Sequence, residues 1–367
     1  ERKALILERA NKLCKDAGLE LVEDAGLLDE VAGLVEWPVP VLGKMDPAFL
    51  DLPAEVIRLS MRTHQKYFAV RDPATGKLAP NFITVANIDA VDGGKAIAAG
   101  NARVLSARLN DARYFWDLDR FYDPIERTKK KALDAPERIE KLKQIVFHQK
   151  LGSVWDKVER VRALAKELCA VTGADPALVD RAAVLSKCDL VTEVVGEFPE
   201  LQGQIGRQIA EWQGVHPSVA IAIEDHYRPL GPNDRVPTDP VAVTLALADK
   251  IDTLVGFWAI DEKPTGSKDP FALRRAALGV VRILQSNNLR LAVLHALSRP
   301  FARIASSERN VKEAVLEQQL VAVSELTIQA RNKFVAEFSR TAYEAGLADD
   351  AGEYAYETAS DVVLFLT

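Results

Sequence analysis

The hydrophobic residues near the start of the chain recur with the spacing of a helix. Ile6, Ala10 and Leu13 lie three or four residues apart, which places them on one face of a helix. This pattern predicts helix over the first 35 residues and breaks at the proline-rich stretch 37–40. A second helix is predicted to start near Pro53, because proline suits the first turn of a helix.

Two β-rich runs follow, at residues 66–71 and 82–86. The segment 72–77 between them contains Pro and Gly, so we expect an antiparallel hairpin there and no other sheet. From about Gly94 onward long amphipathic stretches punctuated by prolines predict helices. Asp269-Pro270 has the composition of a helix start, with Pro270 in the first helical position. The chain is therefore predicted to be mainly α, with a smaller α/β portion at its N-terminal end.

Composition excludes several classes of protein. The 367 residues are 48% hydrophobic and 27% charged, which suits two or three packed domains and does not suit a fibrous or disordered chain. No apolar run approaches the roughly 20 residues needed to cross a bilayer, so no membrane association is expected. The formal net charge of −6 does not favour a polyanion, so a nucleic acid would have to contact local basic patches.

Cysteine content and the chain ends bear on compartment and completeness. The three cysteines are an odd number without close spacing, which argues against a disulfide framework or a zinc ribbon and fits a cytoplasmic location. The chain opens at Glu1 without an initiator methionine and closes on the apolar run 362–367. We expect it to be an internal fragment of a longer polypeptide.

The familiar nucleotide and hydrolase motifs are missing from the sequence. It contains no G-x-x-x-x-G-K-[ST] phosphate loop and no G-x-G-x-x-G fingerprint. It also lacks a G-x-S-x-G elbow, an H-E-x-x-H helix and any Cys-x-x-Cys pair. A phosphate-cradling P-loop is therefore not expected in this chain.

A spaced set of polar residues crosses the helical middle, comprising His148, the pair Cys188-Asp189, His226 and Asp249. This order resembles the HD superfamily of helical metal-dependent phosphohydrolases, in which a His, a His-Asp pair and an Asp hold a divalent metal. His148, Cys188, Asp189 and Asp249 are the candidate ligands, but Cys188 replaces a histidine that such metals favour. The alternative is a metal-free helical core in which Asp249 pairs with a base.

The first candidate RNA contact is the group Arg62, His64 and Lys66 beside Tyr67 and Phe68. Basic and aromatic groups in alternation suit a nucleotide backbone with a stacked base. The other interpretation is an ordinary sheet edge with its apolar side buried.

The second candidate RNA contact comprises Lys268, Arg274 and Arg275, in a polar loop that leads into a helix. A helix N-terminus with first-turn arginines attracts anions, although such arginines also pair with neighbouring carboxylates. Arg103, Arg108, Arg113 and the run 127–131 predict a basic helical surface near Tyr114-Phe115-Trp116, for RNA or a partner subunit. The alternative is a solvated face beside an aromatic cluster that belongs to the core.

Six stretches, which occur in order between residues 34 and 282, are together more specific than any single motif. They are residues 34–38, 61–68, 111–116, 187–193, 196–203 and 264–275. Together they resemble the beta subunit of the bacterial heterotetrameric (alpha2beta2) glycyl-tRNA synthetase.

The resemblance implies a division of labour between two subunits. A separate alpha subunit binds ATP, Mg and glycine and forms the adenylate, whereas the beta subunit supports recognition of tRNA(Gly). The chain would then be non-catalytic on its own and would work in the cytoplasm. An HD-type phosphohydrolase acting on a nucleotide or phosphoester is the alternative.

The same resemblance implies three domains. Residues 1–135 would be an α/β module, the end of a domain similar to the B3/B4 module of the phenylalanyl enzyme. Residues 136–300 would form an HD-like all-helical domain. Residues 301–367 would begin a further helical region that leads toward a C-terminal anticodon-binding domain beyond Thr367.

Overall fold

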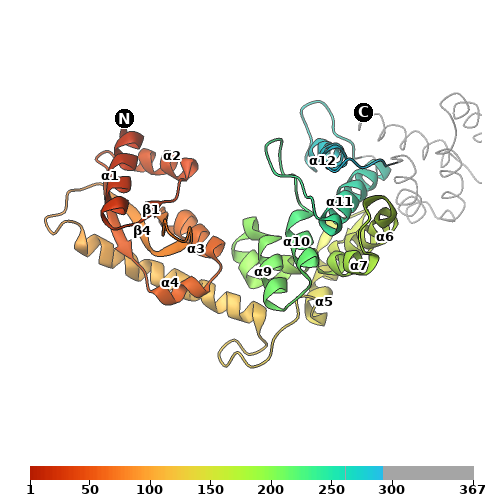
Figure 1. Ribbon diagram of the computed structural model, residues 1–367, viewed down its shortest axis with the longest axis horizontal. Helices are drawn as coiled ribbons and strands as arrows, with labels where there is room; N and C mark the ends of the chain where they lie inside the picture. Colours follow the sequence, from red (N-terminus) through yellow and green to blue (C-terminus); the bar gives the residue numbers. More distant parts are fainter. Residues whose placement is uncertain (261, 292–367) are drawn as a thin grey trace, which may run out of the picture. The chain divides into compact units, whose positions relative to one another are not determined.

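The computed structural model describes residues 1–260 and 262–291, which belong to two compact units (Figure 1). The sheet unit contains Glu1–Lys131 and Thr192–Leu201. The helical unit contains Ala132–Val191 and the described residues from Gln202 onward. The prediction of a mainly α protein with a smaller α/β portion is confirmed.

Helices of the sheet unit surround a small sheet. The helices are α1 (Arg2–Asp16), α2 (Ala25–Leu34), α3 (Ala54–Ser60), α4 (Lys95–Arg120) and α8 (Glu193–Glu197), with short turns η1 (Pro47–Asp51), η2 (Met61–Gln65) and η4 (Pro199–Leu201). The strands are β1 (Glu20–Leu21), β2 (Val39–Lys44), β3 (Phe68–Arg71) and β4 (Leu78–Ala86).

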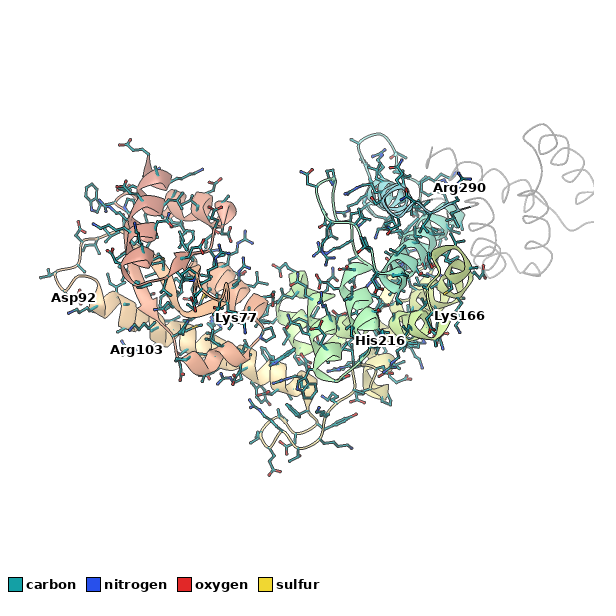
Figure 2. The ribbon with its side chains drawn as sticks, in the orientation of Figure 1. Lys77, Asp92, Arg103, Lys166, His216 and Arg290 are labelled. Atoms are coloured by element: carbon teal, nitrogen blue, oxygen red, sulfur yellow. The ribbon has the colours of Figure 1, made fainter. Side chains whose placement is uncertain are left out.

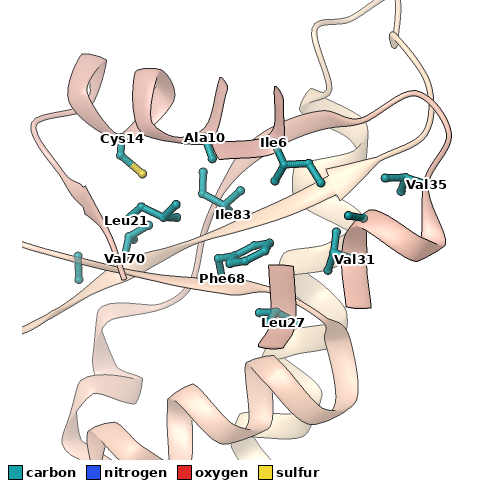
Figure 3. Close-up of a cluster of buried hydrophobic side chains, with 12 residues drawn as sticks. Ile6, Ala10, Cys14, Leu21, Leu27, Val31, Val35, Phe68, Val70 and Ile83 are labelled. Carbon is teal, nitrogen blue, oxygen red and sulfur yellow. The ribbon is translucent and has the colours of Figure 1, made fainter. Parts of the chain in front are cut away.

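All four strands pair antiparallel in the order β1-β3-β4-β2. The core beneath one face of the sheet joins α1 and α2 to the strands (Figure 3). Ile6 and Ala10 of α1 lie in one buried cluster with Phe68 and Ile83. Burying each large side chain of this kind contributes about 1.5–3 kcal/mol, so the cluster anchors α1 to the hairpin.

The β3–β4 hairpin is confirmed, but the expectation of no further sheet was wrong. The helical pattern does break before the prolines at 37–40, since α2 ends at Leu34, but the chain then forms the edge strand β2, which contains Pro40. The prediction of helix over the whole of the first 35 residues was wrong, because β1 separates α1 from α2. An edge strand tolerates proline, since the missing N–H need not serve a ladder bond. Gly43 is required by packing: a Cβ there would lie 2.2 Å from Cζ of Phe82 on the neighbouring strand.

The helical unit is built around one buried helix. Its helices are α5 (Pro136–Gln144), α6 (Val154–Thr172), α7 (Pro176–Leu185), α9 (Gln204–Trp212), α10 (Pro217–Asp225), α11 (Pro240–Ala259) and α12 (Leu273–Ser286), with the turn η3 (Cys188–Val191). Helix α11 packs against α6, α7, α10 and α12. Because it is enclosed in this way, α11 is hydrophobic around almost its whole circumference.

Two details of the helical unit differ from the sequence-based expectation. A short hairpin of β5 (Val146–His148) and β6 (Gly152–Ser153) interrupts the helices. Helix α12 begins at Leu273, so Pro270 does not take the first helical position. Asp269 still caps this helix, because its carboxylate accepts from the amides of Leu273 and Arg274 at 2.8 and 3.0 Å.

The predicted domain boundaries stay predictions, as do the B3/B4-like and HD-like assignments. The predicted region 301–367 lies outside the described residues. Within the described part of the chain, no helix has the length and hydrophobicity that crossing a membrane requires.

Candidate functional site

The first predicted RNA contact lies on a π-helical turn. Helix α3 continues into η2, and the turn closes at Lys66, which takes a left-handed conformation with φ 57°. Arg62 Nε lies 3.0 Å from Asp24 and Lys66 Nζ lies 2.7 Å from Glu30, so two of the basic groups face carboxylates of α2 and its cap. Such π-turns are frequent at functional sites.

The aromatic half of this predicted patch is buried. Tyr67 and Phe68 are only 3% and 2% exposed, and Tyr67 stacks on Phe82 with ring centroids 4.7 Å apart. These rings are therefore part of the core and present no face on which a base could stack. The interpretation as an ordinary sheet with its apolar side buried describes these two residues better.

His64 points elsewhere and lines a polar hollow of about 180 Å³. Its ring packs edge-on against Phe198 at 5.9 Å, and Nε2 lies 3.7 Å from Glu197. The hollow is lined by Ser60, His64, Arg108, Asp111, Ala112, Phe115, Glu197 and Phe198. Three of the stretches that carry the family resemblance, 61–68, 111–116 and 196–203, therefore meet here.

The second predicted RNA contact precedes α12. Thr265 and Lys268 pair through their backbones, and Arg274 donates from Nη2 to the carbonyl of Gly266 at 2.6 Å. This bond holds the loop and leaves Arg274 half-buried. Lys268 and Arg275 are exposed, and neither has a carboxylate partner among residues 1–260 and 262–291.

The four candidate metal ligands are held by other groups. His148 packs its ring against Phe257 at 5.5 Å. Cys188 is fully buried, which raises the pKa of its thiol to about 12, and Sγ donates to a backbone carbonyl of α7. Burial raises the pKa of Asp189 to about 6, while its Oδ2 accepts from the amides of Gly203 and Gly206.

Asp249 is the centre of a buried ion cluster. Its Oδ1 lies 3.5 Å from Nζ of Lys157 and 3.3 Å from Nζ of Lys187. Burial alone would raise the pKa of Asp249, but the two lysines outweigh burial and hold it well below its usual range. Asp249 is therefore ionised and already has basic partners.

His226 completes the cluster as a neutral ring. Burial and the neighbouring Lys187 lower its pKa well below the ordinary value. Nδ1 lies 2.9 Å from the carbonyl of Ile223, which fits a proton on Nδ1. Nε2 then accepts from Nζ of Lys187 at 2.8 Å.

These residues do not fit a divalent metal. Two lysine side chains lie beside the carboxylate of Asp249, and the thiol of Cys188 is protonated. In the part of the chain that the structure describes, no group of three or more His, Cys, Asp or Glu side chains could hold a metal ion. Nothing in this geometry favours the phosphohydrolase alternative.

A family model described as the glycyl-tRNA synthetase beta subunit matches residues 1–351. The chain belongs to this family. The glycine–tRNA ligase beta subunit of Phenylobacterium zucineum is 62% identical over 301 residues, which cover 81% of this chain and 43% of the relative. The corresponding protein of Rhodospirillum centenum is 56% identical over 302 residues, or 82% and 41%.

Membership of the glycyl-tRNA synthetase beta subunit family confirms the resemblance inferred from the short stretches. The chain spans about two fifths of the length of the curated relatives it matches. The family places this protein among the aminoacyl-tRNA synthetases, which is a class of ligase.

Sequence reasoning missed two members of the buried cluster, Lys157 and Lys187. A signal for Lys157 was present, since it lies in the apolar stripe of α6 formed by Val154, Val158 and Val161. A lysine at such a position must find a buried counter-charge. Its hydrogen bond to Asp252, at 3.1 Å, is part of that compensation.

Proposed function

We propose that this chain is a non-catalytic part of the beta subunit of glycyl-tRNA synthetase, supporting recognition of tRNA(Gly). The observation that carries the proposal is the family match over residues 1–351. Both relatives described above are named as beta subunits of glycine–tRNA ligase. The chain belongs to the glycyl-tRNA synthetase beta subunit family, and its role within the subunit is what we propose.

The chemistry of glycylation is assigned to a separate alpha subunit in a heterotetramer. That subunit would use ATP and Mg to activate glycine, and this chain would bind neither cofactor. The sequence supports this assignment, because it contains none of the phosphate-binding motifs of P-loop or dinucleotide enzymes. The assembly would act in the cytoplasm, as the unpaired cysteines led us to expect.

Lys268 and Arg275 are proposed as phosphate contacts of the tRNA. Both are exposed and lack carboxylate partners among the described residues, whereas Arg62 and Lys66 face Asp24 and Glu30. A basic side chain that is already paired gains less from a phosphate, because a pair must first be broken. The loop before α12 is thus the better of the two predicted patches.

Binding of tRNA(Gly) to the full chain tests this proposal, measured by fluorescence anisotropy at several salt concentrations. The double variant Lys268→Glu/Arg275→Glu should weaken binding and reduce the salt slope by about one per lost contact. Lys12→Glu, an exposed lysine of α1, is the matched control. Unchanged affinity and slope in the double variant would remove this surface from the proposal.

Glycine-dependent exchange of pyrophosphate into ATP tests the non-catalytic assignment separately. The purified chain should give no exchange above background, and exchange should appear when a catalytic alpha subunit is added. Exchange by the chain alone would overturn the assignment.

A further inference from the structure

A second polar hollow lies in the sheet unit, toward the C-terminal end of α4. Its volume is about 180 Å³. Three arginines and one tryptophan line it together with two residues from the end of η1. The lining residues are Asp51, Leu52, Arg113, Trp116, Arg120 and Arg127. Arg113, Trp116 and Arg127 belong to the basic surface that the sequence predicts for RNA or a partner subunit, whereas no residue of the buried cluster around Asp249 lines the hollow.

One buried carboxylate holds two of these arginines side by side. Asp117 is 4% exposed and accepts from Nη2 of Arg120 at 2.8 Å. It also accepts from Nη2 and Nε of Arg127 at 2.5 and 3.1 Å. Both guanidinium groups are thereby fixed at the wall of the hollow, which reduces the entropy lost when they bind a ligand.

The backbone that brings Arg127 to this wall is strained. Arg127 has φ 53°, a left-handed conformation that costs a non-glycine residue about 1 kcal/mol or more. The segment 121–131 is held by backbone bonds from Tyr122 to Lys129, at 2.8 Å, and from Lys131 to Arg120, at 2.7 Å. It is not helical, so the expectation of a helical surface was wrong for the run 127–131, whereas Arg103, Arg108 and Arg113 do lie on α4.

Arg113 contributes the third guanidinium group to the hollow. It donates from Nη2 to the carbonyl of Ala48, and its guanidinium lies 4.7 Å from the ring centroid of Phe49. It has no ion-pair partner among residues 1–260 and 262–291. The helix dipole stabilises cations in the last turn of a helix. Arg113 lies seven residues before the end of α4, so the dipole does not account for a cation at this position.

Trp116 adds a buried hydrogen-bond donor. The residue is 5% exposed, and its Nε1 is buried with no hydrogen-bond partner in the part of the chain that the structure describes. A buried N–H of this kind costs free energy unless a ligand or water satisfies it. The hollow is therefore lined by three guanidinium groups and by the tryptophan that carries this indole N–H. The opposing negative charges are two carboxylates, those of Asp117 and Asp51.

We propose that this hollow binds a phosphate group, and that in the functioning protein the phosphate belongs to an RNA backbone. Guanidinium groups bind phosphate oxygens in pairs, and an indole N–H can donate to a further oxygen. This inference rests on the proposed function for its RNA source. The segment 120–131 favours that source, because it carries five basic and two acidic residues and so extends the positive surface beyond the hollow.

Isothermal titration calorimetry of the full chain with inorganic phosphate tests the site itself. Arg113→Gln should lower phosphate affinity about tenfold or more, and Trp116→Phe should lower it several-fold while keeping an aromatic ring in the core. Asp51→Asn should raise the affinity, because it removes the carboxylate that lines the hollow. A gain of this kind cannot arise from misfolding. Arg103→Gln, on an exposed position of α4, is the control and should bind as the unaltered chain does (Figure 2).

The source of the phosphate is tested with tRNA(Gly) and the same variants. If the RNA backbone supplies it, Arg113→Gln weakens tRNA binding and Arg103→Gln does not. Phosphate binding that is lost in Arg113→Gln, with unchanged tRNA binding, would retain the site and overturn the RNA source. If the unaltered chain binds phosphate but no tRNA at all, the proposed function fails and the site stands. Equal phosphate affinity in the unaltered chain and Arg113→Gln would overturn the site.

Discussion

Asp249 in the helical unit and Asp117 in the sheet unit are carboxylates with little exposure, 14% and 6% of the side chain, and each lies between two basic side chains. The partners of Asp249, Lys157 and Lys187, are themselves buried, with side chains 6% and 9% exposed. Arg120 and Arg127, which pair with Asp117, are 16% and 49% exposed and line a hollow. The exposure of the cations, more than that of the acid, separates a cluster that stabilises the fold from one that can meet a ligand.

Asp180 of α7 is a third carboxylate between two cations, and it is more exposed than the other two. It lies between Arg162 and Lys166, both at 2.7 Å, and the side chains of these partners are 33% and 51% exposed. Each of the three carboxylates lies between two cations. Replacing each one in turn should therefore show how far burial determines what such a carboxylate contributes to the free energy of unfolding.

The largest effect is expected for Asp249→Asn. Removing this charge leaves Lys187 buried without its counter-charge and leaves Lys157 with Asp252 alone, and breaking a buried pair typically costs about 3–5 kcal/mol. Urea unfolding of the full chain, followed by circular dichroism, measures the loss. Asp29→Asn is the matched control, because Asp29 pairs with Lys3 on the surface and should lose less than about 1 kcal/mol. Equal losses in the two variants would contradict the comparison.

A smaller loss, about 2 kcal/mol, is expected for Asp117→Asn. Arg120 would remain mostly buried without its carboxylate, whereas Arg127 could turn to solvent. The same variant should also weaken phosphate binding, since Asp117 fixes both guanidinium groups. Urea unfolding and phosphate titration of one preparation measure both effects. Loss of stability with unchanged phosphate affinity would mean that Asp117 does not organise the hollow.

Asp180→Asn should cost about 1 kcal/mol at neutral pH, and the cost should depend on pH. The hydrogen bond from Arg162 lowers the pKa of Asp180 to about 2. The folded pKa thus lies below the unfolded value of about 3.9, so the stabilisation is complete above that value and is lost as pH falls toward 2. Solvent screening keeps the contribution below what the pKa shift alone implies. Urea midpoints of both proteins at pH 7, 5, 4 and 3 should converge in acid, and a constant difference would contradict an electrostatic origin.

Local pairings in this chain were within reach of sequence reasoning, and distant ones were not. The β3–β4 hairpin was predicted because its turn chemistry lies between two β-rich runs. The residue order also showed the basic run near Trp116, although the strained turn at Arg127 could not be foreseen. Strand β2 was missed because its position at the sheet edge, which makes Pro40 acceptable, is a property of the assembled sheet.

The candidate sites show the same limit. The pairing of Arg62 with Asp24 and of Lys66 with Glu30 joins residues almost 40 positions apart, so their charges appeared unpaired in the sequence. Lys157 donates to the backbone carbonyl of Asp249, which is more than 90 residues further along the chain. Spacing along a chain identifies which residue types are present, but only packing decides whether a carboxylate faces a metal, a lysine or solvent.

The smallest effect is expected for Lys166→Gln. This change removes the most exposed of the six cations that flank Asp249, Asp117 and Asp180. Lys166 is half exposed on α6 (Figure 2), and Arg162 retains two hydrogen bonds to Asp180 when the lysine is absent. The attraction that Lys166 gains is largely offset by the entropy of ordering its long side chain, so stability should change by less than about 0.5 kcal/mol. Urea unfolding at neutral pH measures the change, with Asp180→Asn as the reference. A loss as large as that of Asp180→Asn would mean that exposed cations stabilise these carboxylates as strongly as buried ones. The half-exposed Arg127 would then be needed for folding as much as for phosphate, and exposure would no longer distinguish the two clusters.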